Sequence, residues 1–222
     1  MPLIQSYITE ETIGYIEPFV GGANIIDKIK CDNKIGYDIH KQLIELLKHI
    51  QNTVEDLPDT ITEEEYKKVK NNKEKYEDWY VGLVGFCASF GSKYFGGYAR
   101  SKRTKDMSRM GMNNLLKQAP NLEGIKFSCK DFREIKDIKG YVIYCDPPYK
   151  NTIKYNKRGF PYEEFYVWCR EMSKHNTVLI SEYDMPTDFE CIWEKGIKVS
   201  FNSYRGRDNP KDNRVEKLFI CR

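Results

Sequence analysis

Apolar and polar positions alternate along the first fifty residues with the rhythm of an α/β protein. A short apolar, β-rich run at 13–19 ends at two glycines, and a second strand is predicted at 34–38. Residues 23–30 place isoleucines on one side of a predicted helix, and residues 41–51 place apolar side chains at i, i+3, i+4 and i+7. This alternation predicts a parallel sheet with crossover helices.

The rhythm breaks at 52–124, where a charged helical stretch at 63–77 precedes an aromatic segment and a Gly- and Arg-rich passage. Strand-like runs, one helix and a closing hairpin are predicted afterwards, at 125–129, 141–145, 162–174, 177–180, 195–201 and 215–221. The expected fold is α/β and Rossmann-like, with a mainly parallel sheet, a C-terminal antiparallel hairpin and an inserted, mostly helical region. The catalytic domain is expected at 1–51 and 125–222, and the insertion at 52–124.

Composition excludes several protein classes. The chain has 222 residues, of which 40% are hydrophobic and 31% charged, so it is typical of a globular protein. Its seven cysteines show no C-x-x-C spacing and its three histidines are dispersed, so neither a disulfide framework nor a metal site is expected. The odd number of scattered cysteines also predicts a reducing cytosol. No apolar run is long enough to span a bilayer, so we expect no membrane association.

The strongest chemical signal is the tetrapeptide Asp146-Pro147-Pro148-Tyr149 at the end of an apolar run. A proline-rich turn is the plain alternative, but the tetrapeptide is expected by chance in about one chain in a thousand of this length. The Asp146 carboxylate and the Pro147 carbonyl suit the two hydrogens of an exocyclic amine such as that of adenine. The prolines fix the direction of the carbonyl, and Tyr149 offers a ring for an extruded base.

A second signal is the glycine-containing segment after the first predicted strand. Gly21 and Gly22 allow a ligand to approach the backbone closely. Asp38 ends the second predicted strand, where nucleoside-binding α/β folds place a ribose-binding carboxylate. A helix cap is an equally good interpretation of Asp38 when it is taken alone.

These motifs occur in the order found in alpha-class DNA N6-adenine methyltransferases, and the chain resembles Dam-like phage and bacterial members of that family. The resemblance rests on residues 17–23, 38, 85–100, 130–132, 146–149, 179–183 and 214–219. It implies a methyltransferase fold that uses S-adenosylmethionine as methyl donor, without a metal. The implied donor-binding residues are Glu17, Pro18, Phe19, Gly21, Gly22, Asp38, Asp131 and Phe132.

The resemblance also implies double-stranded DNA as substrate, with target recognition by the insertion. Family members usually begin with a Gly- and Lys-containing motif, whereas this sequence begins at 1–7 inside the helix that follows it, so weak donor binding is expected. We further expect a monomer in the cytoplasm of a bacterial or phage-infected cell, where such enzymes can belong to restriction–modification systems.

Basic and aromatic residues interleave between positions 87 and 109, which suits phosphate contacts and base stacking. A solvated basic face is the alternative interpretation. A second polar loop at 204–214 lies between the two closing strands. The candidate DNA-binding residues are Lys93, Tyr94, Tyr98, Arg100, Lys102, Arg103, Arg109, Arg205 and Arg207.

Three functions fit these residues. The first is site-specific methylation of N6 of a flipped-out adenine in duplex DNA. The second keeps the chemistry and changes the amine, since related Pro-Pro-Tyr loops act on cytosine N4, RNA and glutamine. The third is a protein that binds DNA without catalysis.

Overall fold

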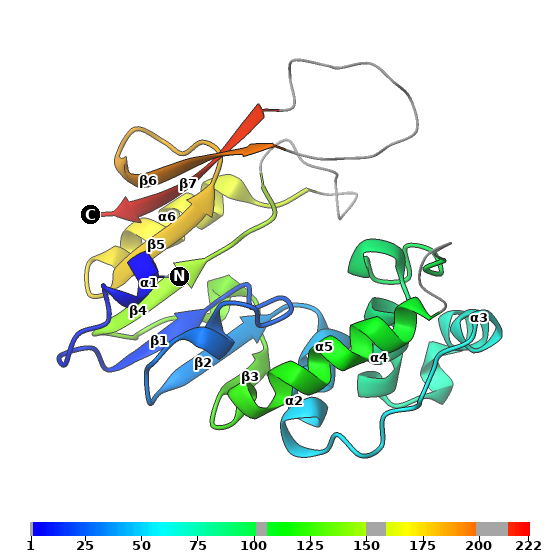
Figure 1. Ribbon diagram of the computed structural model, residues 1–222. Coiled ribbons are helices and arrows are strands. Elements are labelled where there is room, and N and C mark those ends of the chain that lie inside the picture. The colour runs from blue at the N-terminus through cyan, green and yellow to red at the C-terminus, as the bar shows by residue number, and fades with distance from the viewer. Residues whose placement is uncertain (1, 101–105, 150–158, 199–212) are drawn as a thin grey trace. The chain divides into compact units, whose positions relative to one another are not determined.

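The computed structural model describes residues 2–100, 106–149, 159–198 and 213–222 (Figure 1). The chain forms two compact units, one of residues 1–19 and 132–222 and the other of residues 20–131. Across the described residues, no helix is both long enough and apolar enough to cross a membrane.

The first unit contains most of the sheet. β1 pairs in parallel with β4, and β4 with β5, whereas β7 runs antiparallel to both β5 and β6. Its elements are α1 (Pro2–Gln5), β1 (Gly14–Glu17), η4 (Phe132–Glu134), β4 (Tyr141–Cys145), α6 (Tyr162–Ser173), β5 (Thr177–Glu182), β6 (Phe189–Lys198) and β7 (Asn213–Cys221).

Burial explains why the central strands carry continuous apolar runs. Ile16, Ile143 and Leu179 are fully buried, one on each of three neighbouring strands, which is the pattern of a parallel strand covered on both faces. α6 turns Phe165 and Cys169 into the same core.

The second unit holds two parallel strands and the helical insertion. Its elements are η1 (Ile26–Lys28), β2 (Lys34–Asp38), α2 (Lys41–Asn52), α3 (Glu63–Asn71), η2 (Lys73–Lys75), α4 (Asp78–Cys87), η3 (Phe90–Ser92), α5 (Met107–Leu122) and β3 (Lys126–Cys129). Helices α2 and α4 approach so closely that a Cβ on Gly82 would lie 2.2 Å from the carbonyl oxygen of Gln42. Only glycine fits this crossing.

The strand order within the first unit is β1-β4-β5-β7-β6, and in the second unit β2 pairs in parallel with β3. The predicted fold class, a mainly parallel α/β sheet with a C-terminal antiparallel hairpin, is therefore confirmed. The insertion is mostly helical, as predicted.

Two predicted helices differ in the structure. Residues 23–30 form only the short 3-10 helix η1, because Ala23 has a left-handed backbone (φ +56°) and Ile29 is extended. The charged stretch at 63–77 is interrupted at Asn72, whose backbone (φ −139°, ψ 44°) ends α3 before η2 begins.

Candidate active site

The Asp-Pro-Pro-Tyr tetrapeptide at 146–149 leaves the carboxyl end of β4, as the sequence predicts. β4 is buried between two parallel neighbours, and Cys145 pairs with Ile180 at its last position. Parallel strands bring their carboxyl ends to one edge, where open α/β sheets place ligands. The strand therefore delivers Asp146 to the edge at which ligand chemistry is expected.

Hydrogen bonds connect the tetrapeptide to the end of β5. The Tyr149 hydroxyl is hydrogen-bonded to the Asp146 carboxylate, and buried Ser181 is hydrogen-bonded to both Tyr149 and Tyr144. The Tyr183 ring meets the Tyr149 ring edge to face, with centroids 4.7 Å apart. Ser181 and Tyr183 thus contact the side chains of the Asp-Pro-Pro-Tyr loop, a role that the sequence pattern did not assign to them.

The Asp146 carboxyl group has an unusual acidity. The residue as a whole is exposed, but desolvation of its carboxyl group raises the pKa to about 6, against the lowering effect of the Tyr149 hydrogen bond. The Glu216 carboxylate raises it further. Burial also raises the pKa of Tyr149, so its hydroxyl keeps its proton as a donor. Asp146 is therefore mainly an acceptor-only carboxylate at neutral pH.

Tyr162, the first residue of α6, fixes the backbone of the same loop. Its hydroxyl donates a hydrogen bond of 2.6 Å to the carbonyl oxygen of Pro148. Burial, aided by the negative charge of Glu182, raises the pKa of Tyr162, so the hydroxyl remains a donor. No residue spacing in the sequence indicates this contact, because it joins segments separated by fourteen positions.

An aromatic cluster lies in the same unit as the tetrapeptide. Phe132 is almost fully buried and packs against four rings at centroid distances of 5.6 to 5.8 Å. Phe19 and Phe160 are only half-buried. The sequence identified Phe19 and Phe132 but missed Phe160. The cluster consists of Phe19, Phe132, Phe160, Phe165 and Trp168.

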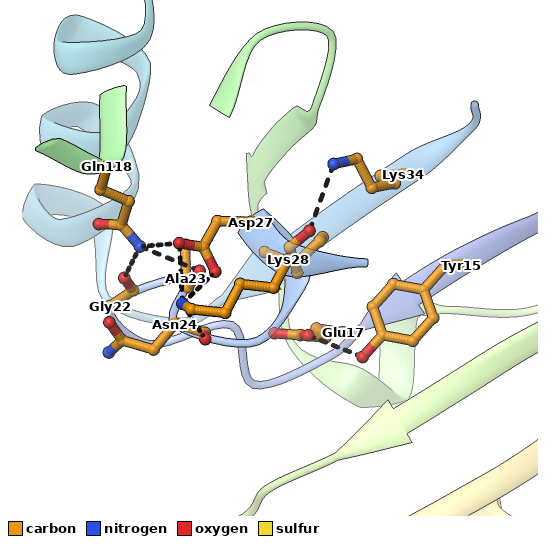
Figure 2. Close-up of polar contacts among 10 residues, drawn as sticks. Tyr15, Glu17, Gly22, Ala23, Asn24, Asp27, Lys28, Lys34 and Gln118 are labelled. Atoms are coloured by element: carbon orange, nitrogen blue, oxygen red, sulfur yellow. Dashed lines mark hydrogen bonds and ion pairs between the residues drawn. The ribbon is translucent and has the colours of Figure 1, made fainter. Parts of the chain in front are cut away.

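Glu17 and Pro18 are buried at the end of β1. The Tyr15 hydroxyl donates a hydrogen bond of 2.8 Å to Oε1 of Glu17 (Figure 2). Burial raises the pKa of Tyr15, so this hydroxyl stays a donor to the carboxylate. The contact secures the strand end from which the following segment departs.

Residues 20–24, here called the glycine loop, open the second unit. Gly21 has a left-handed backbone (φ +48°), and its N–H donates a hydrogen bond of 3.1 Å to Oδ2 of Asp38. A Cβ built on Gly21 would meet no atom within 4 Å, so the backbone faces open space. The loop thus offers a surface that a ligand can approach closely.

Asp38 joins the glycine loop to the start of α2. Its Oδ1 accepts the N–H of His40 at 2.9 Å, and burial raises its pKa. His40 itself caps α2, since its Nδ1 accepts the N–H of Leu43 at 3.3 Å and desolvation lowers its pKa. The helix cap is therefore His40, which the sequence reasoning missed. Half-buried Asp131 follows Lys130, whose N–H bonds the carbonyl oxygen of Asp38 at 3.0 Å.

Two tyrosines of the basic and aromatic segment at 87–109 make contacts that stabilise the fold. Tyr94 packs against His40 at 4.3 Å, and the Tyr98 hydroxyl donates to the carbonyl oxygen of Ile61 at 2.9 Å. Tyr98 therefore ties two parts of the insertion together, and Tyr94 packs the insertion against the residue that caps α2. Lys93 is exposed at the end of η3.

Two arginines of this segment form ion pairs on the surface. Arg100 makes a bidentate contact with Glu63, and Arg109 contacts the Asp59 carboxylate at 2.6 Å. Exposed ion pairs of this kind are weak, so each arginine can exchange its carboxylate partner for another anion. The candidates Lys102, Arg103, Arg205 and Arg207 lie outside the described residues.

The groups available for ligand binding near the glycine loop favour an organic cofactor. The open glycine loop and the carboxylate of Asp38 offer backbone and carboxylate contacts suited to a nucleoside. Over the ranges that the structure describes, no three His, Cys, Asp or Glu side chains gather to hold a metal ion.

Comparisons with known proteins place these motifs in context. A family profile described as D12 class N6 adenine-specific DNA methyltransferase matches residues 1–80 and 79–202. The crystal structure of SMU.472, described as a methyltransferase complexed with SAH, shows 9% identity and a TM-score of 0.28. The alignment covers 86% of this chain and 48% of that one, so the chain spans about half the length of that protein. A search of curated proteins gave no match.

Proposed function

Since the chain belongs to the D12 class of N6 adenine-specific DNA methyltransferases, we propose that it methylates N6 of a flipped-out adenine in duplex DNA, with S-adenosylmethionine as donor. The observation that carries the proposal is the Asp-Pro-Pro-Tyr loop at the end of β4, with the Asp146 carboxylate hydrogen-bonded by Tyr149. The family favours adenine over cytosine N4, RNA or glutamine. The intact loop counts against a DNA-binding protein without catalysis.

In the proposed mechanism, Asp146 and the Pro147 carbonyl accept the two hydrogens of the adenine amine. This draws the nitrogen toward tetrahedral geometry and frees its lone pair from the ring. A bound donor would supply an electrophilic methyl group on its sulfonium. As the N–C bond forms, the S–C bond breaks and leaves a neutral thioether, and the methylated nitrogen loses one proton to solvent. Tyr149 stacks on the extruded base, while Tyr162 fixes the direction of the loop backbone through Pro148.

Donor binding is proposed for Phe19, Gly21, Gly22, Asp38, Asp131 and Phe132, with Glu17 and Pro18 securing the strand end. Each oxygen of the Asp38 carboxylate accepts one backbone N–H and keeps a further lone pair for a ribose hydroxyl. Half-buried Phe19 offers a ring surface, whereas buried Phe132 supports the cluster behind it.

DNA contacts are proposed for the insertion at 52–124, with the catalytic domain at 1–51 and 125–222. We expect exposed Lys93 and Arg100 to lie closest to the duplex. Tyr94, Tyr98, Lys102, Arg103, Arg109, Arg205 and Arg207 complete the proposed set. A monomer in the cytoplasm of a bacterial or phage-infected cell is part of the same proposal.

A direct test supplies S-adenosylmethionine with a tritiated methyl group and two duplexes of equal length. One duplex has mixed sequence and the other contains only G·C pairs. The proposal expects label in the mixed duplex alone. Label in both duplexes would instead indicate cytosine as the acceptor, and binding of DNA without any label would support the non-catalytic alternative.

The raised pKa of Asp146 predicts that the reaction slows at acidic pH. The carboxylate accepts an amine hydrogen only when it is ionised, so kcat/KM is expected to fall tenfold per pH unit below about pH 6. The Asp146→Asn variant has no carboxyl group that titrates at this position. The kcat/KM of its residual activity is therefore expected to show no fall near pH 6. A limb near pH 4 in the native chain would show that the carboxylate is not desolvated.

Loss of the Tyr162 hydroxyl is expected to lower kcat about tenfold, since one hydrogen bond that orients the loop is removed. Tyr162→Phe retains the ring, so the KM for the donor is expected to change less than twofold. Tyr166→Phe removes a hydroxyl one turn later on α6 and serves as the matched control. Equal kcat values for the two variants would contradict the positioning role.

A further inference from the structure

The glycine loop has carbonyl groups that no regular helix satisfies. Gly21 and Ala23 both have left-handed backbones, and Ala23, which is fully buried, pays a steric cost there that glycine would avoid. The loop conformation is therefore not the intrinsic preference of these residues. It requires contacts from elsewhere to stay populated.

Gln118 supplies those contacts (Figure 2). Its Nε2 donates to the carbonyl oxygens of Gly22 and Ala23 at 3.0 Å each, and lies 3.2 Å from Oδ2 of Asp27. Lys28 binds the next carbonyl, that of Asn24, at 2.7 Å. Side chains thus add to the main-chain bonds of this segment. The N–H of Asp27 still donates to the Ala23 carbonyl at 3.3 Å, whereas Lys28 Nζ meets the Asn24 carbonyl.

Gln118 does not belong to the loop or to the strands that flank it. It lies near the end of α5, 91 to 96 positions along the chain from its three partners. The cap of the same helix, Asp106, lies within the basic and aromatic segment at 87–109. One helix of the insertion therefore reaches the loop whose open backbone is proposed to face the donor.

We propose that Gln118 is a positioning residue for methyl-donor binding, through which the insertion completes the donor site as well as contributing to DNA recognition. This inference rests on the proposed function, because it takes the glycine loop as a donor-binding element. The amide holds two successive carbonyls in the arrangement that leaves Gly21 open, so the donor meets a preformed loop.

Gln118→Met tests the inference, because methionine keeps the length and flexibility of the side chain but cannot donate. The dissociation constant for S-adenosylmethionine, measured by calorimetry, is expected to rise about tenfold with the loss of these bonds. The KM for the donor is expected to rise equally. The kcat at saturating donor and the dissociation constant for a mixed-sequence duplex are expected to stay within twofold. Gln118→Glu is expected to lose more affinity, since its carboxylate faces two carbonyls and Asp27.

Asn114→Ala is the matched control, since it removes an exposed carboxamide one turn earlier on α5. It should leave donor affinity unchanged. Equal donor affinity of the native chain and Gln118→Met would overturn the inference while leaving the proposed function intact. Parallel losses of donor affinity, DNA affinity and melting temperature would also overturn it, because they would indicate a structural role. Failure of the native chain to bind S-adenosylmethionine at all would contradict both proposals.

Discussion

Asp146→Ala is expected to lower the rate of methyl transfer by about a thousandfold, because the variant lacks the carboxylate that draws one hydrogen from the amine. Preorganised groups of this kind are worth about two to three orders of magnitude in kcat. The interaction strengthens as the nitrogen becomes tetrahedral, so it affects the transition state more than the bound ground state. Affinities for DNA and donor are therefore expected to stay within about threefold.

Single-turnover rates with a mixed-sequence duplex measure the effect. Asp188→Ala removes an exposed aspartate that pairs with Arg170 and is expected to behave like the native chain. A rate for Asp146→Ala within tenfold of the native rate would remove Asp146 from the mechanism.

Folding provides an independent check on the same carboxylate. Its folded pKa lies above the ordinary value, so the fold favours the protonated form, and that stability is lost as the pH rises through about 6. Asp146→Asn is therefore expected to melt at a higher temperature than the native chain at pH 7.5. The difference should disappear near pH 4, where both side chains are neutral in the fold.

Tyr149→Ala is expected to reduce kcat by about a hundredfold, because it removes both the stacking surface and the hydroxyl bonded to Asp146. Tyr149→Phe keeps the ring and is expected to lose about tenfold. Loss of the hydroxyl also removes the one contact that lowers the pKa of Asp146, so the acid limb of Tyr149→Phe should move to higher pH.

The comparison of the two Tyr149 variants decides which part of the side chain matters. Base extrusion can be followed with 2-aminopurine in place of the target adenine, since its fluorescence rises when it leaves the stack. Weaker fluorescence with Tyr149→Ala than with Tyr149→Phe would support stacking. Equal losses of rate and fluorescence in both variants would assign the role to the hydroxyl instead.

Local sequence signals were sufficient for much of the fold. β2 and β4 coincide with their predicted ranges. β4 was predictable because a continuous apolar run that ends at turn residues has few alternatives. The helix predicted at 23–30 was wrong, since Ala23 has a left-handed backbone and Ile29 is extended. Gln118 and Lys34 bind carbonyls of this segment from outside it. Isoleucine spacing cannot reveal donors that arrive from another part of the chain.

The same distinction holds for the candidate site. Asp146 and Tyr149 could be proposed from the sequence because the tetrapeptide places its functional groups in consecutive residues. Tyr162, His40 and Gln118 were missed, since each acts through one side-chain contact whose partner is set by packing. Such contacts leave no periodic or compositional signal in a single sequence.

Mass spectrometry can detect methylated nucleosides in plasmid DNA from cells that express the chain and lack other adenine methyltransferases. N6-methyladenine is expected in that DNA, with none above background in cells expressing Asp146→Ala at the same level. Unmodified adenine in both samples, with the native chain folded and present, would contradict methylation of adenine by this chain, as would N4-methylcytosine in place of N6-methyladenine.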